Sequence, residues 1–289
     1  DGSYQMDKSF ASDLRYRLVF KNELGFSIGF NMVLVPASVS TLGKASPEGV
    51  DMTVTEESDD KLFRRCVVNN TVYDYISRCN ADDLGILPPP ADLRLWILNS
   101  METGSAVMMH HGAVLQNDMM KSFLGNYARI LEYFLPDITI GTKGQSTYKE
   151  IYSATAHELA HASHFAQVGT EYWDKYIRYV VESYVTNEGE FYGDGSAAGS
   201  GYCEVSEMWA YYLQSKLYKQ RYGGTFPAVG TNWWFYPQIF RFMDERGLEQ
   251  SDIFSVLTED VDTRLALKNA LLLRFPGDRE MIDQVFSRY

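Results

Sequence analysis

The chain has 289 residues, with 26 basic and 38 acidic side chains and a net charge of −12. Its length and its 45% of hydrophobic residues are enough for a sizeable core, in one large or two ordinary domains. The acidic balance argues against nucleic acid or an anionic membrane surface as a partner, and no apolar run is long enough to form a transmembrane segment.

The cysteines exclude two kinds of cysteine-based site, and the first residues indicate how the chain begins. Cys66, Cys79 and Cys203 are an odd number at unrelated spacings, which rules out a disulfide framework and a thiolate zinc knuckle alike. Asp1–Gln5 contains neither an initiator Met nor a basic and apolar signal region. We therefore expect a processed or truncated start.

The N-terminal part has the pattern of β-strands. Alternating apolar residues over 14–20 and an apolar run over 28–35 predict two strands. The turn residues at 22–25 lead us to expect that these strands pair as a hairpin. Residues 36–60 are polar and rich in Ser, Thr, Gly and acids, so we expect a long loop and, if the chain divides, a boundary there.

The rest of the chain alternates strands and helices and then becomes helical. The expected elements are a short helix over 67–84, a strand over 93–98 with a partner strand over 106–109, a helix over 118–135, a strand over 137–141, and helices over 147–169, 171–185 and 202–222. From Trp233 onward the periodicity is mostly helical, with breaks near Gly247 and Pro276. No internal repeat is visible.

The segment His157-Glu158-Leu159-Ala160-His161 has the pattern H-E-x-x-H. Thr147 and Glu150 form a T-x-x-E capping box before it, and Gly169 stands where a C-terminal cap would stand, so we expect one helix between them. On a helix the two histidines lie one turn apart on one face, as the first two ligands of a zinc ion do. The alternative is a buried helix whose histidines hydrogen-bond to neighbours.

A catalytic zinc site takes three protein ligands, so a third must come from elsewhere. A metzincin would have a Gly three residues and a third His six residues after His161, but His164 and Gln167 occupy these positions, which excludes that class. Glu204 and Glu207 lie three apart on one face of the helix expected over 202–222, and one of them can reach the metal. We favour Glu207, because Ala210 is small enough to let this helix approach the first one closely.

These motifs resemble those of the gluzincin metallopeptidases, in which H-E-x-x-H is followed on a second helix by a glutamate ligand within E-x-x-A-[DE]. The matching residues are Glu207 and Ala210, while Tyr211 stands where the family commonly has an acid that hydrogen-bonds a ligand histidine. The resemblance covers roughly residues 137–215 and implies one zinc ion.

The resemblance also implies a fold class and a location. The fold class is α+β and zincin-like, with a small twisted sheet over the active-site helix and a mainly helical C-terminal half. From the sequence pattern itself, we expect the catalytic domain to span 61–289, with a helical part over 225–289, after a β-rich segment over 1–60. An edge strand, at 106–109 or 137–141, would hold an extended peptide. The overall character is similar to exported, surface-anchored zinc peptidases of gut bacteria, so we expect a periplasmic, cell-surface or extracellular protein.

The expected function is zinc-dependent hydrolysis of peptide bonds in a peptide or protein substrate. Zinc on His157, His161 and Glu207 would lower the pKa of a bound water toward about 7. Glu158, roughly 60° round the helix from His161, would take that proton and later pass it to the leaving amine. His164 or a tyrosine such as Tyr211 would stabilise the oxyanion.

Several alternatives remain open. His164 is as well explained as a surface or core histidine. His110 and His111 could line the cleft, but we favour a structural role, because adjacent side chains on a strand point to opposite faces. Packing explains the aromatic residues of 171–185. Other functions are a zinc amidase with Cys203 as third ligand, in the manner of deformylases, or a non-catalytic binding or surface protein on a zincin scaffold.

Overall fold

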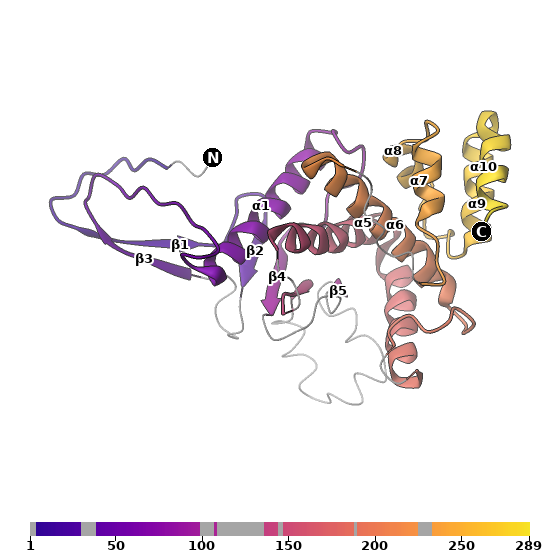
Figure 1. Ribbon diagram of the computed structural model, residues 1–289, viewed down its shortest axis with the longest axis horizontal. Coiled ribbons are helices and arrows are strands. Elements are labelled where there is room, and N and C mark those ends of the chain that lie inside the picture. The colour runs from indigo at the N-terminus through magenta and orange to yellow at the C-terminus, as the bar shows by residue number, and fades with distance from the viewer. Residues whose placement is uncertain are drawn as a thin grey trace.

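The computed structural model describes residues 4–29, 39–98, 107–108, 136–143, 147–187, 190–224 and 233–289. The helix predicted over 118–135, and His110 and His111, lie outside these residues. The described part is a mixed α/β structure with two small sheets, followed by a helical C-terminal half (Figure 1). None of its helices is both long enough and apolar enough to cross a membrane.

The predicted N-terminal hairpin is confirmed only next to its turn, and the strand predicted over 28–35 is described only as far as Gly29. The backbone N–H of Asn22 donates to Phe26 O at 2.8 Å, and Lys21 pairs antiparallel with Ser27. Farther from the turn, strand β1 (Leu14–Val19) pairs with β3 (Val39–Ala45), while β2 (Phe26–Gly29) joins a different sheet. All four β2 residues are buried, as in strands of a sheet that is covered on both faces. The prediction of a loop over 36–60 is wrong for residues 39–45, which form β3. This strand has no apolar pattern of its own, and it forms by pairing with β1.

Within the described residues, the central sheet has four strands in the order β2-β4-β6-β5. Strand β4 (Leu93–Leu98) confirms the prediction for 93–98 and lies parallel to both β2 and β6 (Ile138–Gly141). Strand β5 (Val107–Met108) runs antiparallel along β6, so it is not the partner of β4 that we predicted. Of the two segments considered as the substrate-holding edge, β5 is at an edge and β6 is internal.

Helix α1 (Asp60–Asn80) lies between β2 and β4 in the chain, as a parallel strand pair requires a long crossover. It starts seven residues earlier than the predicted 67 and ends at 80 rather than 84. Asp59 sets the start, because its side chain accepts a hydrogen bond from Leu62 N at 3.0 Å and so caps the first turn.

The helices predicted from 147 onward are confirmed in existence. They are α5 (Tyr148–Thr186), α6 (Ser200–Tyr222), α7 (Gln238–Asp244), α8 (Gln250–Ser255), α9 (Arg264–Arg274), the short 3₁₀ helix η3 (Pro276–Asp278) and α10 (Arg279–Phe286). Both hydrogen bonds of the Thr147–Glu150 capping box are present at the start of α5. Gly169 interrupts α5 with φ 76° and ψ −177°, where we predicted that the helix ends.

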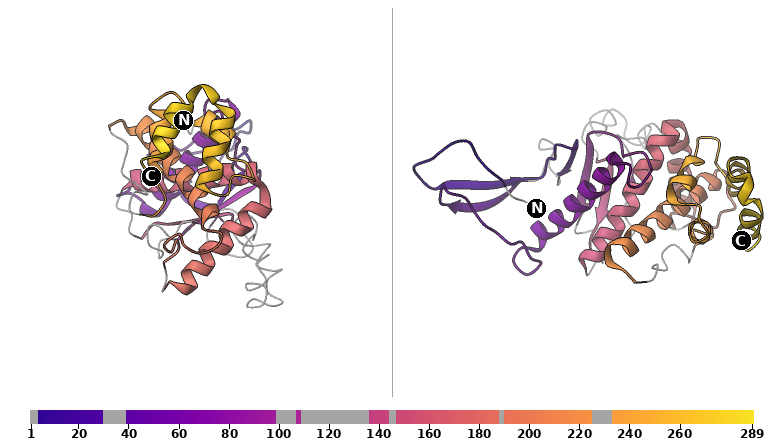
Figure 2. Two further views of the ribbon diagram at one scale, coloured as in Figure 1. Left: turned by 90° about the vertical axis from the view of Figure 1, so that its right-hand side faces the viewer. Right: turned by 90° about the horizontal axis from the view of Figure 1, so that it is seen from above.

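The elements follow one another along the length of the molecule. The β1–β3 ribbon projects at one end, the central sheet with α1, α5 and α6 forms the middle, and α7 to α10 form the other end (Figures 1 and 2). Helix α5 packs against both α1 and α6 and also contacts β5 and β6. The H-E-x-x-H segment therefore lies in the middle of the molecule, on a helix that contacts two other helices and two strands (Figure 1).

The break at Gly169 changes the direction of α5, which Figure 1 shows as a bend. In a straight helix, Tyr176 would lie about 22 Å along the axis from His161. Instead, the rings of Tyr176 and His161 are 5.7 Å apart, centroid to centroid. The conformation of Gly169 belongs to a region that is almost restricted to glycine, so this residue permits the second half of α5 to lie against the motif.

We predict that Gly169→Ala lowers the free energy of unfolding by about 1–3 kcal/mol, because a Cβ strains this backbone conformation even though the space around it is open. Urea unfolding measures the difference. Gly277→Ala is the matched control. A Cβ at this position would also contact no other atom within 4 Å, but φ of Gly277 is not positive. Equal stability of the two variants would contradict the role given to Gly169.

Candidate metal centre

Two helices bring together the three residues that the sequence selects as metal ligands. His157 and His161 lie on α5, and Glu207 lies on α6. One potential ligand atom from each lies within 4.8 Å of the other two, and all three residues are buried. Within the described part of the chain, no other trio of His, Cys, Asp or Glu side chains meets this condition.

The spacing of the ligand atoms fits a metal ion. The two Nε2 atoms of the histidines are 3.1 Å apart, and oxygens of Glu207 lie 3.4 Å from His157 Nε2 and 3.5 Å from His161 Nε2. A tetrahedral zinc ion with bonds of about 2.0–2.2 Å separates its ligand atoms by roughly 3.3–3.6 Å. Glu207 Oε2 has no hydrogen-bond partner among the described residues, so it is free to bind a metal.

The three ligand residues strongly affect one another's protonation. Burial alone would raise the pKa of Glu207, but the adjacent histidines hold it well below its usual range. Burial would likewise lower the pKa of His157, but the hydrogen bond and charge of Glu207 raise it above its ordinary value. Burial lowers the pKa of His161 more than Glu207 raises it. A charged carboxylate is therefore retained beside the two imidazoles.

Glu158 lies beside the ligands and takes no part in the three-residue group. Burial raises the pKa of its carboxyl group to about 8; His157 lowers it, and Glu207 adds a further rise. Its Oε2 has no hydrogen-bond partner among the described residues. The carboxyl group is thus close enough to His157 and Glu207 to respond to their charges, and one oxygen remains available for a proton.

Two residues that sequence reasoning missed contact the ligands directly. Gln214, on α6, lies with its Oε1 3.0 Å from His157 Nδ1, and Tyr176 donates its hydroxyl to Glu207 Oε1 at 2.7 Å. The seven-residue spacing of Gln214 from Glu207, which puts both on one face of α6, could have indicated the first. Nothing in the sequence separates Tyr176 from the other 19 of the 20 tyrosines, and the packing explanation given for it is incomplete.

The structure places Tyr211 and His164 in different surroundings. The ring of Tyr211 lies against that of His157, with centroids 4.5 Å apart, and stacks on Phe235. The side chain of His164 is completely buried and packs against Tyr172 and Trp173, away from the three ligand atoms. This burial favours the interpretation of His164 as a core histidine over a contact with substrate.

Glu204 and Cys203 do not join the ligand group. Glu204, the alternative third ligand, instead faces Arg264 of α9, with a carboxylate oxygen 3.3 Å from Nε. Cys203 is fully buried, and burial raises the pKa of its thiol well above the ordinary value. A neutral, buried thiol outside the trio gives no support to a cysteine-ligated site.

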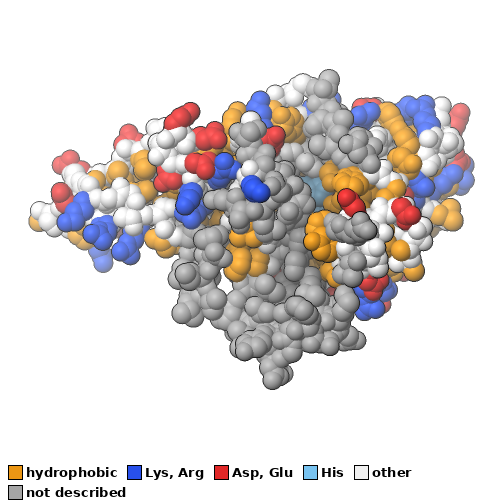
Figure 3. Space-filling view, turned by 60° about the horizontal axis from the view of Figure 1, so that its bottom comes forward, with side chains coloured by type: hydrophobic (Ala, Val, Ile, Leu, Met, Phe, Trp, Pro, Cys, Tyr) orange, Lys and Arg blue, Asp and Glu red, His pale blue; other side chains and the backbone are white. Residues whose placement is uncertain are grey.

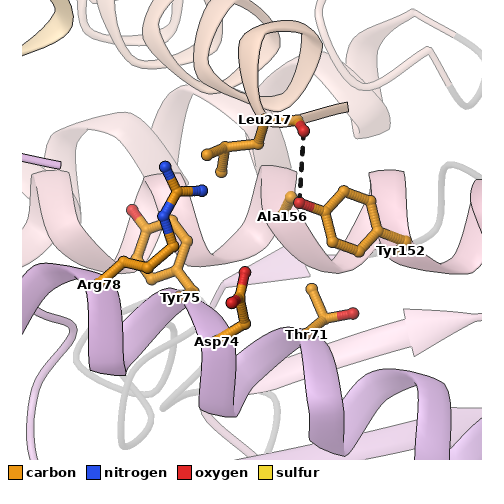
Figure 4. Close-up of a pocket in the computed structure, with 7 residues that line it drawn as sticks. All are labelled: Thr71, Asp74, Tyr75, Arg78, Tyr152, Ala156 and Leu217. Carbon is orange, nitrogen blue, oxygen red and sulfur yellow. Dashed lines mark hydrogen bonds between the residues drawn. The ribbon is translucent and has the colours of Figure 1, made fainter. Parts of the chain in front are cut away.

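Hydrophobic side chains are among the described residues that border the site at the surface (Figure 3). His157 is the most exposed of the described histidines, at 8% of its surface. Figure 3 shows a small histidine surface next to hydrophobic side chains. A separate small pocket lies where α1, α5 and α6 meet, and Figure 4 shows the residues that line it, Thr71, Asp74, Tyr75, Arg78, Tyr152, Ala156 and Leu217. It contains one carboxylate and no histidine, so it offers no comparable set of ligands.

Comparison of the chain with models of known families, with curated proteins and with solved structures found no match. The geometry of the site therefore carries the functional argument.

We predict that Glu207→Gln weakens binding of Zn²⁺ by at least about 100-fold, because a neutral amide replaces the only charged ligand. Isothermal titration calorimetry of the metal-free protein measures this. Glu204→Gln is the matched control on the same helix and should bind Zn²⁺ like the wild type. Loss of binding in the Glu204 variant alone would overturn the assignment of Glu207.

We further predict that His164 makes the metal-free protein sensitive to acid. Burial lowers the pKa of its imidazole to about 3, with a further decrease from His161. The unfolded chain takes up this proton near about pH 6.5 and the folded chain does not, so stability falls as the pH drops from about 6.5 toward 3 by up to about 1.4 kcal/mol per unit. His164→Leu should remove this part of the slope in urea unfolding series. An unchanged slope would contradict the prediction.

Proposed function

We propose that this chain is a zinc-dependent peptidase with a zincin-like fold of the gluzincin type. The observation that carries the proposal is the convergence of His157, His161 and Glu207, with a buried acid, Glu158, next to the first ligand. Two nitrogen ligands and one carboxylate are a donor set that suits zinc. Three protein ligands also leave a coordination position open, as catalytic zinc sites do.

When bound, the zinc ion would supply a Lewis acid that polarises a carbonyl group and lowers the pKa of a water molecule toward about 7. The side chains around it would move the proton. The raised pKa of Glu158 would be lowered by the positive charge of a bound ion, and the carboxylate accepts the proton of the attacking water and later delivers it to the nitrogen of the leaving amine. Glu207 and the two histidines stay bound and unprotonated throughout, because a proton on any of these donors would compete with the metal.

Tyr211 is the residue that we propose to stabilise the oxyanion. Its ring lies against His157, and its pKa is raised by burial, so its hydroxyl remains a proton donor at neutral pH. A hydrogen bond to the developing negative charge is strengthened by a buried setting. In this proposal His164 has no catalytic role, because it is packed in the core.

The substrate that fits this arrangement is an extended peptide. Among the strands that the structure describes, β5 is at the edge of the central sheet, and it contacts α5, which carries the motif. A free strand edge binds an extended chain through main-chain hydrogen bonds, largely independently of its sequence. We propose that a peptide pairs with this edge and presents a carbonyl group to the metal.

We predict that Glu158→Gln retains Zn²⁺ and loses at least about 100-fold in the rate of peptide hydrolysis, because the amide cannot accept the proton. The measurement pairs zinc content by elemental analysis with cleavage of a mixed peptide library followed by mass spectrometry. His157→Ala should lose both the zinc and the activity.

Two outcomes would contradict the proposed function. If the wild-type protein holds about one zinc per chain but cleaves no peptide or unfolded protein, a binding protein on the same scaffold is the better interpretation. If Glu158→Gln cleaves as fast as the wild type, hydrolysis does not use this base.

A further inference from the structure

Two polar side chains form a hydrogen-bonded chain that ends at the ligand histidine His157. Its Nδ1 lies 3.0 Å from Gln214 Oε1, and Gln214 Nε2 donates to Ser153 Oγ at 2.7 Å. Ser153 and His157 lie one turn apart on α5, and Gln214 reaches them from α6. All three residues are at least nine-tenths buried, so water does not compete strongly for these hydrogen bonds.

The direction of these bonds fixes the tautomer of His157. An amide oxygen only accepts hydrogen bonds, so Nδ1 must carry the proton that it donates to Gln214. Nε2 then keeps its lone pair, and Nε2 is the atom that faces His161 and Glu207. The opposite tautomer would place a proton where the metal must bind.

Ser153 gives the amide nitrogen of Gln214 a buried partner. A glutamine side chain can turn over and exchange its oxygen and nitrogen, in which case it would donate to Nδ1 and favour the wrong tautomer. In the structure the amide nitrogen donates to Ser153 Oγ, and the amide oxygen faces His157. The two other ligands lack this arrangement, since Glu207 is held by Tyr176 and His161 Nδ1 has no partner among the described residues.

We propose that Gln214, whose amide nitrogen is bound by Ser153, is a positioning residue that holds His157 in its Nδ1-protonated tautomer and thereby sets the affinity of the site for zinc. This inference rests on the proposed metal site, but not on the peptidase activity. The amide adds no negative charge, so Glu207 is the only anionic group in contact with the ligand histidines through a hydrogen bond or ion pair, within the part of the chain that is described. The effect of Gln214 on the tautomer of His157 can therefore be measured separately from the effect of the negative charge of Glu207.

The first experiment uses the metal-free full chain. Long-range proton–nitrogen NMR spectra of ¹⁵N-histidine-labelled protein report which ring nitrogen carries the proton, and His157→Gln assigns the signal. At a pH above the raised pKa of His157, where the ring is neutral, we expect Nδ1 protonation in the wild type and a mixture of tautomers in Gln214→Leu, which removes the acceptor at similar volume. Protonation of Nε2 alone in the wild type would overturn the proposal.

The second experiment measures zinc affinity by competition with a chromophoric chelator. Gln214→Leu should bind Zn²⁺ about 10–100-fold more weakly than the wild type, in line with other residues that orient metal ligands. Gln214→Glu retains the acceptor and should keep at least wild-type affinity. A purely structural role would weaken both variants, and equal loss in Leu and Glu variants would therefore overturn the proposal.

Ser153 provides a second test that leaves Gln214 in place. Ser153→Ala removes the buried partner of the amide nitrogen and should weaken zinc binding less than Gln214→Leu does, while Ser153→Thr keeps the hydroxyl and should restore it. Wild-type affinity in Ser153→Ala would overturn the role of the serine. A wild-type chain that shows Nδ1 protonation but binds no zinc would contradict the proposed function and the link to affinity, and would leave only the tautomer assignment.

Discussion

The close contact between α5 and α6 is the constraint on which the candidate site depends. Contacts between the helices pair Ser153 with Gln214, His157 with both Gln214 and Glu207, and His161 with Glu207, so the two helices run antiparallel. Trp209 adds a bond from its buried indole nitrogen to Ala160 O, at 3.1 Å. Buried polar contacts of this kind between helices need the helices to be close enough for most of the buried groups to find a partner.

Burial of Glu207 explains why histidine and tyrosine side chains surround it. An isolated carboxylate in the interior is strongly unfavourable, and two imidazoles with a tyrosine hydroxyl offset that cost here. The same arrangement leaves Glu207 Oε2 and Glu158 Oε2 without hydrogen-bond partners among the described residues. Unsatisfied buried oxygens reduce stability, and their presence at one place is typical of a binding or catalytic site.

The break at Gly169 places the second half of α5 against the site. It allows one continuous stretch of chain to supply both His161 and Tyr176, which lie against each other in space although fifteen residues separate them. Helix α6 then closes the arrangement from the opposite side with Glu207, Tyr211 and Gln214. The site thus needs two helices and one glycine, and the β1–β3 ribbon at the end of the molecule takes no part in it.

The sequence determined the local features of this protein. Helical periodicity, the capping box at Thr147 and the break at Gly169 are set by neighbours within a few residues, and H-E-x-x-H needs only a helix to bring its histidines together. The tertiary structure decided the features that join distant segments. It paired β1 with β3 rather than with β2, because the burial of β2 in the central sheet outweighs the short turn between them. It also chose Glu207 over Glu204 and revealed Gln214 and Tyr176, since which face of a helix meets another helix depends on packing across the whole molecule.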